Sequence, residues 1–91
     1  MSYTVNFTLE AKKALAKIKK SNHSLWKKTD KILNELVDNP RKGTGHPEPL
    51  KGGNMITYSR RLSAHDRIIY DIYEDYLVVL VLQLEGHYDD K

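Results

Sequence analysis

Cysteine is absent from the 91 residues, which excludes disulfides, thiol nucleophiles and thiolate metal sites. The four histidines lack the spacing of a zinc site. Long apolar runs are also absent, because the longest, residues 77–82, is far too short to span a bilayer. The first residues do not combine a basic segment with an apolar run, so we expect no signal peptide. These absences favour a cytoplasmic protein with no membrane segment, no metal and no other cofactor.

What remains is a small basic chain. Its length suits one domain with one modest core and leaves no room for a separate cofactor-binding domain. The formal net charge is +3, and acidic residues dominate only from residue 71 onward. A basic surface suits a polyanion such as RNA, or an acidic protein partner. The basic residues in question are Lys12, Lys13, Lys17, Lys19, Lys20, Arg41, Lys42, Lys51, Arg60, Arg61 and Arg67.

Hydrophobic periodicity predicts the element order β-α-α-β-β-β. Thr8 can cap the first helix, and Pro40 ends the second because proline cannot continue the hydrogen-bond ladder. We therefore expect an α+β fold, an antiparallel-type twisted sheet with the helical hairpin packed on one face. The expected elements are a strand at 4–7, a helix that begins after Thr8 and breaks at Ser21-Asn22, a helix over 23–37, and strands at 55–62, 67–73 and 76–84, the last two joined by a tight turn at Glu74-Asp75.

Residues 39–54 form a predicted loop that contains all three prolines and four of the five glycines. Loops of this length are often functional. Glu48 stands between Pro47 and Pro49, which hold its carboxylate on a stiff, extended segment. A fixed carboxylate can act as a general base, although a solvated loop glutamate is the commoner explanation of such a residue. His46 is close enough to Glu48 in sequence to touch the same substrate.

Three arginines lie on adjacent predicted strands. Strand alternation sends Arg60 and Arg61 to opposite faces, with Arg60 on the side of Ile56 and Tyr58. Arginine is suited to bidentate contact with phosphate, so Arg60, Arg61 and Arg67 are candidates for an RNA-binding set. A solvated sheet face with ordinary ion pairs is an equally good explanation of the same pattern.

His87 follows the last predicted strand and precedes Tyr88. An unperturbed imidazole titrates near ~6.5, so it can hold a proton and release it near neutral pH. His87 is thus a candidate general acid, with a plain surface histidine as the alternative. Lys51 is a further candidate for a phosphate contact.

Four segments in a fixed order resemble the YoeB/Txe toxins of the RelE/ParE superfamily. The resemblance extends over essentially the whole chain and is strongest at 43–70 and 87–88. It implies a RelE-like microbial ribonuclease fold. The segments are Gly43-x-Gly45-x-Pro47-Glu48-Pro49-Leu50-Lys51, Ser59-Arg60-Arg61, Arg67-Ile68-Ile69-Tyr70 and His87-Tyr88.

The resemblance implies the toxin of a type II toxin–antitoxin module, a ribonuclease that cuts mRNA in the 30S A site of the ribosome without a metal. It implies neutralisation by a YefM/Phd-type antitoxin, and a homodimer is compatible with it. Glu48 matches the general base, Arg67 the phosphate-stabilising arginine, and His87 the general acid. Tyr88 matches the terminal aromatic residue that orients substrate. Lys51 and Arg61 match supporting cations and, with Arg60 and His46, complete the expected substrate-binding set.

Two alternatives share the fold. One is a ParE-like toxin that binds DNA gyrase and cuts no RNA, although such a protein has no need of the set Glu48, Arg67 and His87. The other is a catalytically degenerate member that only binds an antitoxin and represses its own operon. The residues Asp89-Asp90-Lys91 after Tyr88 keep this alternative open beside the leading nuclease hypothesis, because two carboxylates would repel a phosphate.

Overall fold

The structure is a computed structural model that describes residues 2–50 and 56–84, and it confirms the predicted α+β order. The two-residue strand β2 inside the expected loop was not predicted. The expected turn at Glu74-Asp75 is a 3-10 turn that includes Tyr76, so the last strand begins at Val78 and not at residue 76. The elements are β1 (Thr4–Phe7), α1 (Leu9–Ser21), α2 (His23–Asp38), β2 (Glu48–Pro49), β3 (Thr57–Arg61), β4 (Arg67–Tyr73), the 3-10 turn η1 (Glu74–Tyr76) and β5 (Val78–Gln83).

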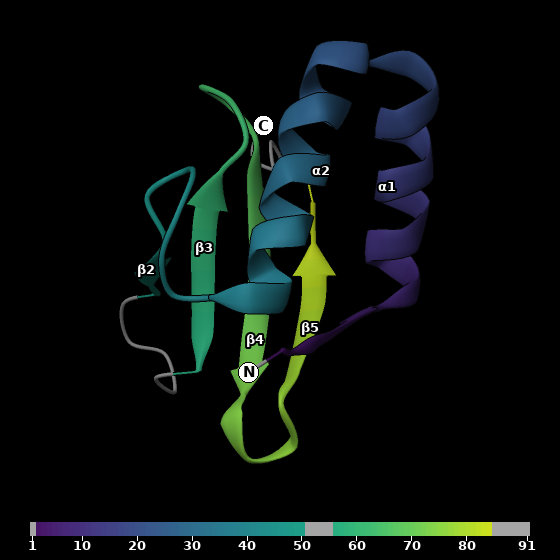
Figure 1. Cartoon of the computed structure of the whole chain (residues 1–91). Helices are drawn as coiled ribbons and strands as arrows, with labels where there is room; N and C mark the ends of the chain where they lie inside the picture. The colour runs from purple at the N-terminus through teal and green to yellow at the C-terminus, as the bar shows by residue number, and fades with distance from the viewer. Residues whose placement is uncertain (1, 51–55, 85–91) are drawn as a thin grey trace.

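The five strands form one sheet in the order β1-β5-β4-β3-β2. The pairs β5–β4, β4–β3 and β3–β2 are antiparallel, whereas β1 runs parallel to β5. The sheet is therefore mixed rather than purely antiparallel, because α1 and α2 lead the chain away from β1 before the later strands form. Figure 1 shows these two helices side by side on one side of the sheet. No helix in the described part of the chain is long and apolar enough to cross a membrane.

Two polar residues fix the helical hairpin. Thr8 caps α1 as predicted, since its Oγ1 accepts a hydrogen bond from the Ala11 amide at 3.1 Å. Asn22 ends α1 by donating its backbone N–H to the Ile18 carbonyl. The Asn22 side chain then begins α2 by accepting from the Leu25 amide at 3.1 Å. One residue thus makes the sharp reversal between the helices.

The core lies between the helices and one face of the sheet. Alternation along the strands sends every second side chain into this layer. The remaining side chains of β3 and β4, Arg61 and Arg67 among them, belong to the face that the helices do not cover. The buried apolar residues are Ala11, Ile18, Leu25, Ile32, Leu36, Leu62, Ile68, Tyr70, Ile72, Val79, Val81 and Leu84.

Candidate active site on the open face of the sheet

Strand pairing brings Glu48 and Arg67 into one pocket. In the β2–β3 pair Glu48 lies opposite Ser59, and in the β3–β4 pair Arg61 lies opposite Arg67. The resulting pocket has a volume of about 300 Å³. The structure thus unites two residues that the sequence separates by a loop and a strand. The pocket is lined by Glu48, Pro49, Leu50, Ser59 and Arg67.

The short strand β2 determines where the Glu48 carboxylate stands. The Leu50 amide donates to the Thr57 carbonyl at 2.9 Å, which anchors the end of β2 to β3. Pro49 has no N–H and cannot extend a ladder, which helps to keep the strand short. Glu48 itself is exposed at this edge of the sheet. Glu48 therefore lines the pocket and is also accessible to a large substrate.

Arg61 and Arg67 form a pair of like charges directly opposite one another. Both are exposed. Within the described residues, acidic side chains form ion pairs with Arg41 and Arg60 rather than with this pair. Like charges opposite each other on neighbouring strands destabilise a sheet, and an anion placed between them would offset that repulsion. The arrangement is suited to holding a phosphate.

Arg60 is placed differently from the expectation of a phosphate contact. Its side chain is fully buried on the helix side of the sheet, as its strand parity indicated. It forms an ion pair of 2.7 Å with Glu35 and hydrogen bonds with Tyr70 and with loop carbonyls. Its donors are therefore directed away from the pocket, and we remove Arg60 from the substrate-binding set.

The other predicted residues are distributed as follows. His46 is exposed and has a left-handed backbone at φ 53°, but it does not line the pocket. Lys51, His87 and Tyr88 lie outside the described residues. Within the described ranges, no three His, Asp or Glu side chains converge as metal ligands.

Sequence reasoning gave no role to Ser59, which the structure places in the pocket. Ser59 is buried and lies opposite Glu48. The one available indication was its position two residues before Arg61 on the same strand, which puts both side chains on the face of the sheet that the helices do not cover. On the same face Asp71 accepts hydrogen bonds from Thr57 at 2.5 Å and from Tyr73 at 3.1 Å. The hydrogen bond to Asp71, and then its negative charge, raise the pKa of Tyr73 above 10.0.

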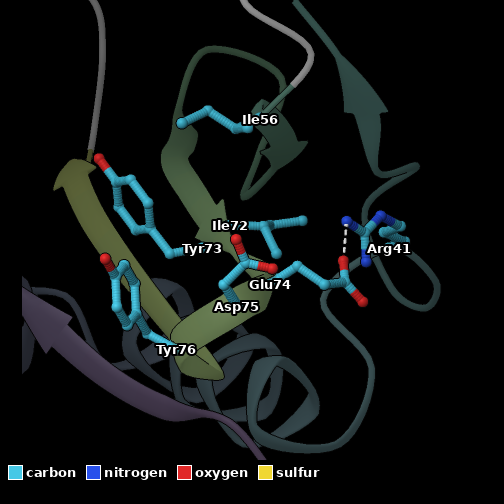
Figure 2. Close-up of a pocket in the computed structure, with 7 residues that line it drawn as sticks. All are labelled: Arg41, Ile56, Ile72, Tyr73, Glu74, Asp75 and Tyr76. Atoms are coloured by element: carbon cyan, nitrogen blue, oxygen red, sulfur yellow. Dashed lines mark hydrogen bonds and ion pairs between the residues drawn. The ribbon is translucent and has the colours of Figure 1, made fainter.

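Another pocket, of about 230 Å³, lies beside η1 and gathers none of the predicted residues. Figure 2 shows the Arg41–Glu74 ion pair at one side of it, with an N–O distance of 2.6 Å, and Tyr76 at the other. The Arg41 and Glu74 side chains are 40% and 61% exposed, and an ion pair so accessible to water is weak. Because the arginine of this pocket is already paired with the Glu74 carboxylate, it is not the candidate active site.

Comparisons with known proteins agree on one family. The family model for the YoeB-like toxin of bacterial type II toxin–antitoxin systems matches residues 7–88. A toxin YoeB from Streptomyces coelicolor is 34% identical over 68 residues, which are 75% of this chain and 79% of the relative.

Solved structures agree on the fold. A YoeB/ParE toxin from Agrobacterium tumefaciens has a TM-score of 0.84 at 26% identity, covering 93% of this chain and 99% of that one. Two Staphylococcus aureus structures, a YoeB dimer and a YoeB–YefM complex, have TM-scores of 0.81 and 0.80. Both are 22% identical to this chain and cover 97% of it and all of the other chain.

Proposed function

Because the chain belongs to the YoeB-like toxins of bacterial type II toxin–antitoxin systems, we propose that it inhibits translation as a ribosome-dependent mRNA endoribonuclease. The observation that carries the proposal is the pocket that holds Glu48 together with Arg67. A carboxylate can remove a proton from a ribose hydroxyl, and a guanidinium can hold the neighbouring phosphate. Neither role needs a metal. The site of action would be the 30S A site, in the cytoplasm.

The proposed reaction is an internal transfer of the phosphate. Glu48 takes the proton of a 2′-hydroxyl, and the 2′-oxygen forms a bond to the adjacent phosphorus. Arg67, with Arg61 opposite it, stabilises the negative charge that gathers on the phosphate oxygens. The bond from phosphorus to the 5′-oxygen then breaks, and His87 gives that oxygen a proton. The products are a 2′,3′-cyclic phosphate and a 5′-hydroxyl.

The proposal gives the remaining roles to Tyr88, Lys51 and His46. Tyr88 orients the substrate, and Lys51 supports the phosphate as a point charge. His46 is exposed two residues before Glu48, where it can meet the RNA without lining the pocket. No cofactor takes part.

The proposed partner is a YefM/Phd-type antitoxin. Support comes from the YoeB–YefM complex among the structures that share this fold. The basic surface supports it as well, since an acidic and partly disordered segment can fold onto such a surface. The YoeB dimer among the same structures supports a homodimer for the free toxin.

The test is primer extension on a message translated in a purified system. We expect the wild type to cut within codons, and only when ribosomes are present. Glu48→Ala should slow cutting by about 10²–10⁴-fold because it removes a general base. Arg67→Ala should slow it by about 10²–10³-fold because it removes a charge that stabilises the transition state. His87→Ala should also slow cutting, because it removes the proposed general acid.

The matched control is Glu10→Ala. Glu10 is an exposed glutamate in the first turn of α1, outside the pocket, and its variant should cut like the wild type. An intact message with the wild type, while translation continues, would contradict the nuclease proposal. That result would favour the gyrase-binding or antitoxin-binding alternative.

A further inference from the structure

Arg60 is a buried charged residue at a position where an apolar side chain would be enough to fill the core. Its side chain has no exposed area, yet it carries a full positive charge. Such a charge is tolerated only where it is paired and hydrogen-bonded. Its partners come from α2, from β4 and, for the most part, from the loop that leads to Glu48. They are Glu35 at 2.7 Å, the Tyr70 hydroxyl at 3.0 Å, and the carbonyls of Asn39 at 3.0 Å, Lys42 at 2.8 Å and Thr44 at 3.3 Å.

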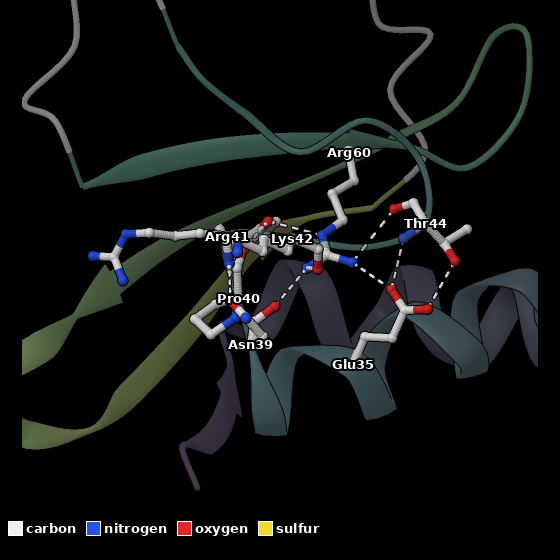
Figure 3. Close-up of polar contacts among 8 residues, drawn as sticks. Glu35, Asn39, Pro40, Arg41, Lys42, Thr44 and Arg60 are labelled. Carbon is white, nitrogen blue, oxygen red and sulfur yellow. Dashed lines mark hydrogen bonds and ion pairs between the residues drawn. The ribbon is translucent and has the colours of Figure 1, made fainter. Parts of the chain in front are cut away.

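Glu35 completes the attachment of the loop from the helix side. Its carboxylate accepts from the Thr44 amide at 2.8 Å and from the Thr44 hydroxyl at 2.7 Å, besides the bond from Arg60. Figure 3 shows α2 and β3 joined in this way through the loop between them. Tyr70 adds a further bond, since its hydroxyl donates to the Pro40 carbonyl at 2.7 Å. The loop is thus held by α2, β3 and β4 together.

Two glycines let the loop approach this closely. Gly43 has φ +125°, and a Cβ there would lie 2.3 Å from a carboxylate oxygen of Glu35. Gly45 has φ +86°, and a Cβ there would lie 2.5 Å from the Arg61 carbonyl oxygen. The Gly45 carbonyl in turn accepts from the Arg61 amide at 2.7 Å. The chain therefore enters the segment that carries Glu48 from a fixed position.

We infer that the Glu35–Arg60 ion pair is a positioning device, which fixes the loop 39–45 and through it sets the place of Glu48 relative to Arg67. The inference rests on the proposed function, because it gives the pair a role in that reaction. Arg60 and Glu35 are positioning residues and touch no substrate. The adjacent arginines have different roles in this inference. Arg60 holds the loop on the helix-covered face of the sheet, and Arg61 is on the opposite face, where the phosphate of the proposed substrate would bind. Small displacements of a reacting group are costly, which gives such a device its value.

The test variants are Glu35→Gln, which removes the charge and keeps the shape, and Gly43→Ala, which pushes the loop away from Glu35. The control is Glu74→Gln, which removes the charge from the exposed Arg41–Glu74 pair, a contact of the same loop in which neither Glu35 nor Arg60 takes part. Single-turnover cutting of ribosome-bound message is measured against toxin concentration, at a temperature where each full-length variant is folded. We expect both test variants to lower the saturating rate by about 10–10²-fold, with the half-saturating concentration unchanged. The control should keep both values.

A second measurement separates positioning from stability. In a Glu48→Ala background, adding Glu35→Gln should cause no further loss of rate if the pair acts through Glu48. Hydrogen exchange supplies a readout that needs no activity. The Arg61 amide donates to the Gly45 carbonyl and the Leu50 amide to the Thr57 carbonyl. In the test variants these two amides should exchange faster than they do in the wild type, while the amides of β5 should keep their wild-type rates.

The results distinguish this inference from the proposed function. A cutting wild type with an unchanged saturating rate in Glu35→Gln and Gly43→Ala overturns the inference alone. A full additional loss in the Glu48→Ala background also overturns it, because the pair would then act on something other than Glu48. A wild type that cuts nothing overturns the proposed function, and the catalytic role inferred for the pair with it.

Discussion

Arg60 and Arg61 carry the same side chain at adjacent positions, yet their surroundings are opposite. Arg60 is enclosed by Glu35, Tyr70 and loop carbonyls, whereas Arg61 is exposed opposite Arg67. The alternation of a strand is enough to produce this difference, because each step along β3 changes the face of the sheet. Arg60 therefore holds the loop that leads to Glu48, whereas Arg61 is accessible to the phosphate of the proposed substrate.

The contrast predicts unequal effects on stability. Arg60→Leu removes the ion-pair partner of the Glu35 carboxylate and leaves several loop carbonyls without their donor, and we expect it to lower the free energy of unfolding by about 3 kcal/mol. Arg61→Leu is the matched control and should change it by no more than about 0.5 kcal/mol. Urea denaturation followed by circular dichroism measures both. Equal losses in the two variants would contradict the assignment of Arg60 to the interior.

A pH dependence follows from Glu35. Burial opposes ionisation of its carboxyl, but hydrogen bonds from Thr44 and Arg60, with the charge of Arg60, outweigh burial and lower the pKa below 4.5. The stabilisation from Glu35 should thus be fully present above pH 4.5 and be lost as the pH falls through the lowered pKa. Denaturation of wild type and Glu35→Gln across this range measures it. We expect the stability advantage of the wild type to shrink in acid, and parallel curves would refute the linkage.

At the scale of the element, the helices and long strands follow from local pattern. Strand β4 occupies the predicted residues 67–73, and α2 extends one residue beyond its predicted end. The two-residue β2 was not predicted, because its Glu-Pro sequence has no periodicity and it exists only through pairing with β3. The parallel pairing of β1 with β5 likewise depends on tertiary structure and could not be predicted from local pattern. Local patterns report which face a side chain takes but not which distant segment it meets.

The same limit applies to the candidate site, where local pattern predicted the face of each side chain but not its distant partners. Strand parity placed Arg60 inside and Arg61 outside, but nothing local indicated that loop carbonyls would surround Arg60. The pairing of Glu48 with Arg67 came from the family resemblance, and the structure supplies the pocket that joins them. Ser59 was not foreseen, since its place opposite Glu48 depends on the register of β2.

The helical hairpin offers a test at this scale. Asn22 both ends α1 and caps α2, so Asn22→Ala should lower the free energy of unfolding by about 1 kcal/mol. Ser24→Ala, in the exposed first turn of α2, is the control and should have little effect. Thermal denaturation of the two variants compares them. A negligible loss in Asn22→Ala would show that packing alone sets the reversal between the helices.

At the scale of the whole molecule, the net charge of +3 and the basic outer residues matter most for association. If the toxin meets RNA phosphates on the ribosome, its binding releases counterions and weakens as salt rises. We expect ribosome pelleting assays to show a steady loss of affinity between roughly 50 and 200 mM salt. Binding that is indifferent to salt would argue for a mainly apolar contact.

The central claim is that the pocket of Glu48 and Arg67 drives attack by a ribose 2′-hydroxyl. The most direct measurement uses a message with one 2′-deoxy nucleotide immediately before the cut, compared with the same message unmodified. The account predicts that the wild type cuts the unmodified message to a 2′,3′-cyclic phosphate and leaves the deoxy message intact. Equal cutting of both messages would contradict it, because the nucleophile would then be something other than the hydroxyl that Glu48 is proposed to activate.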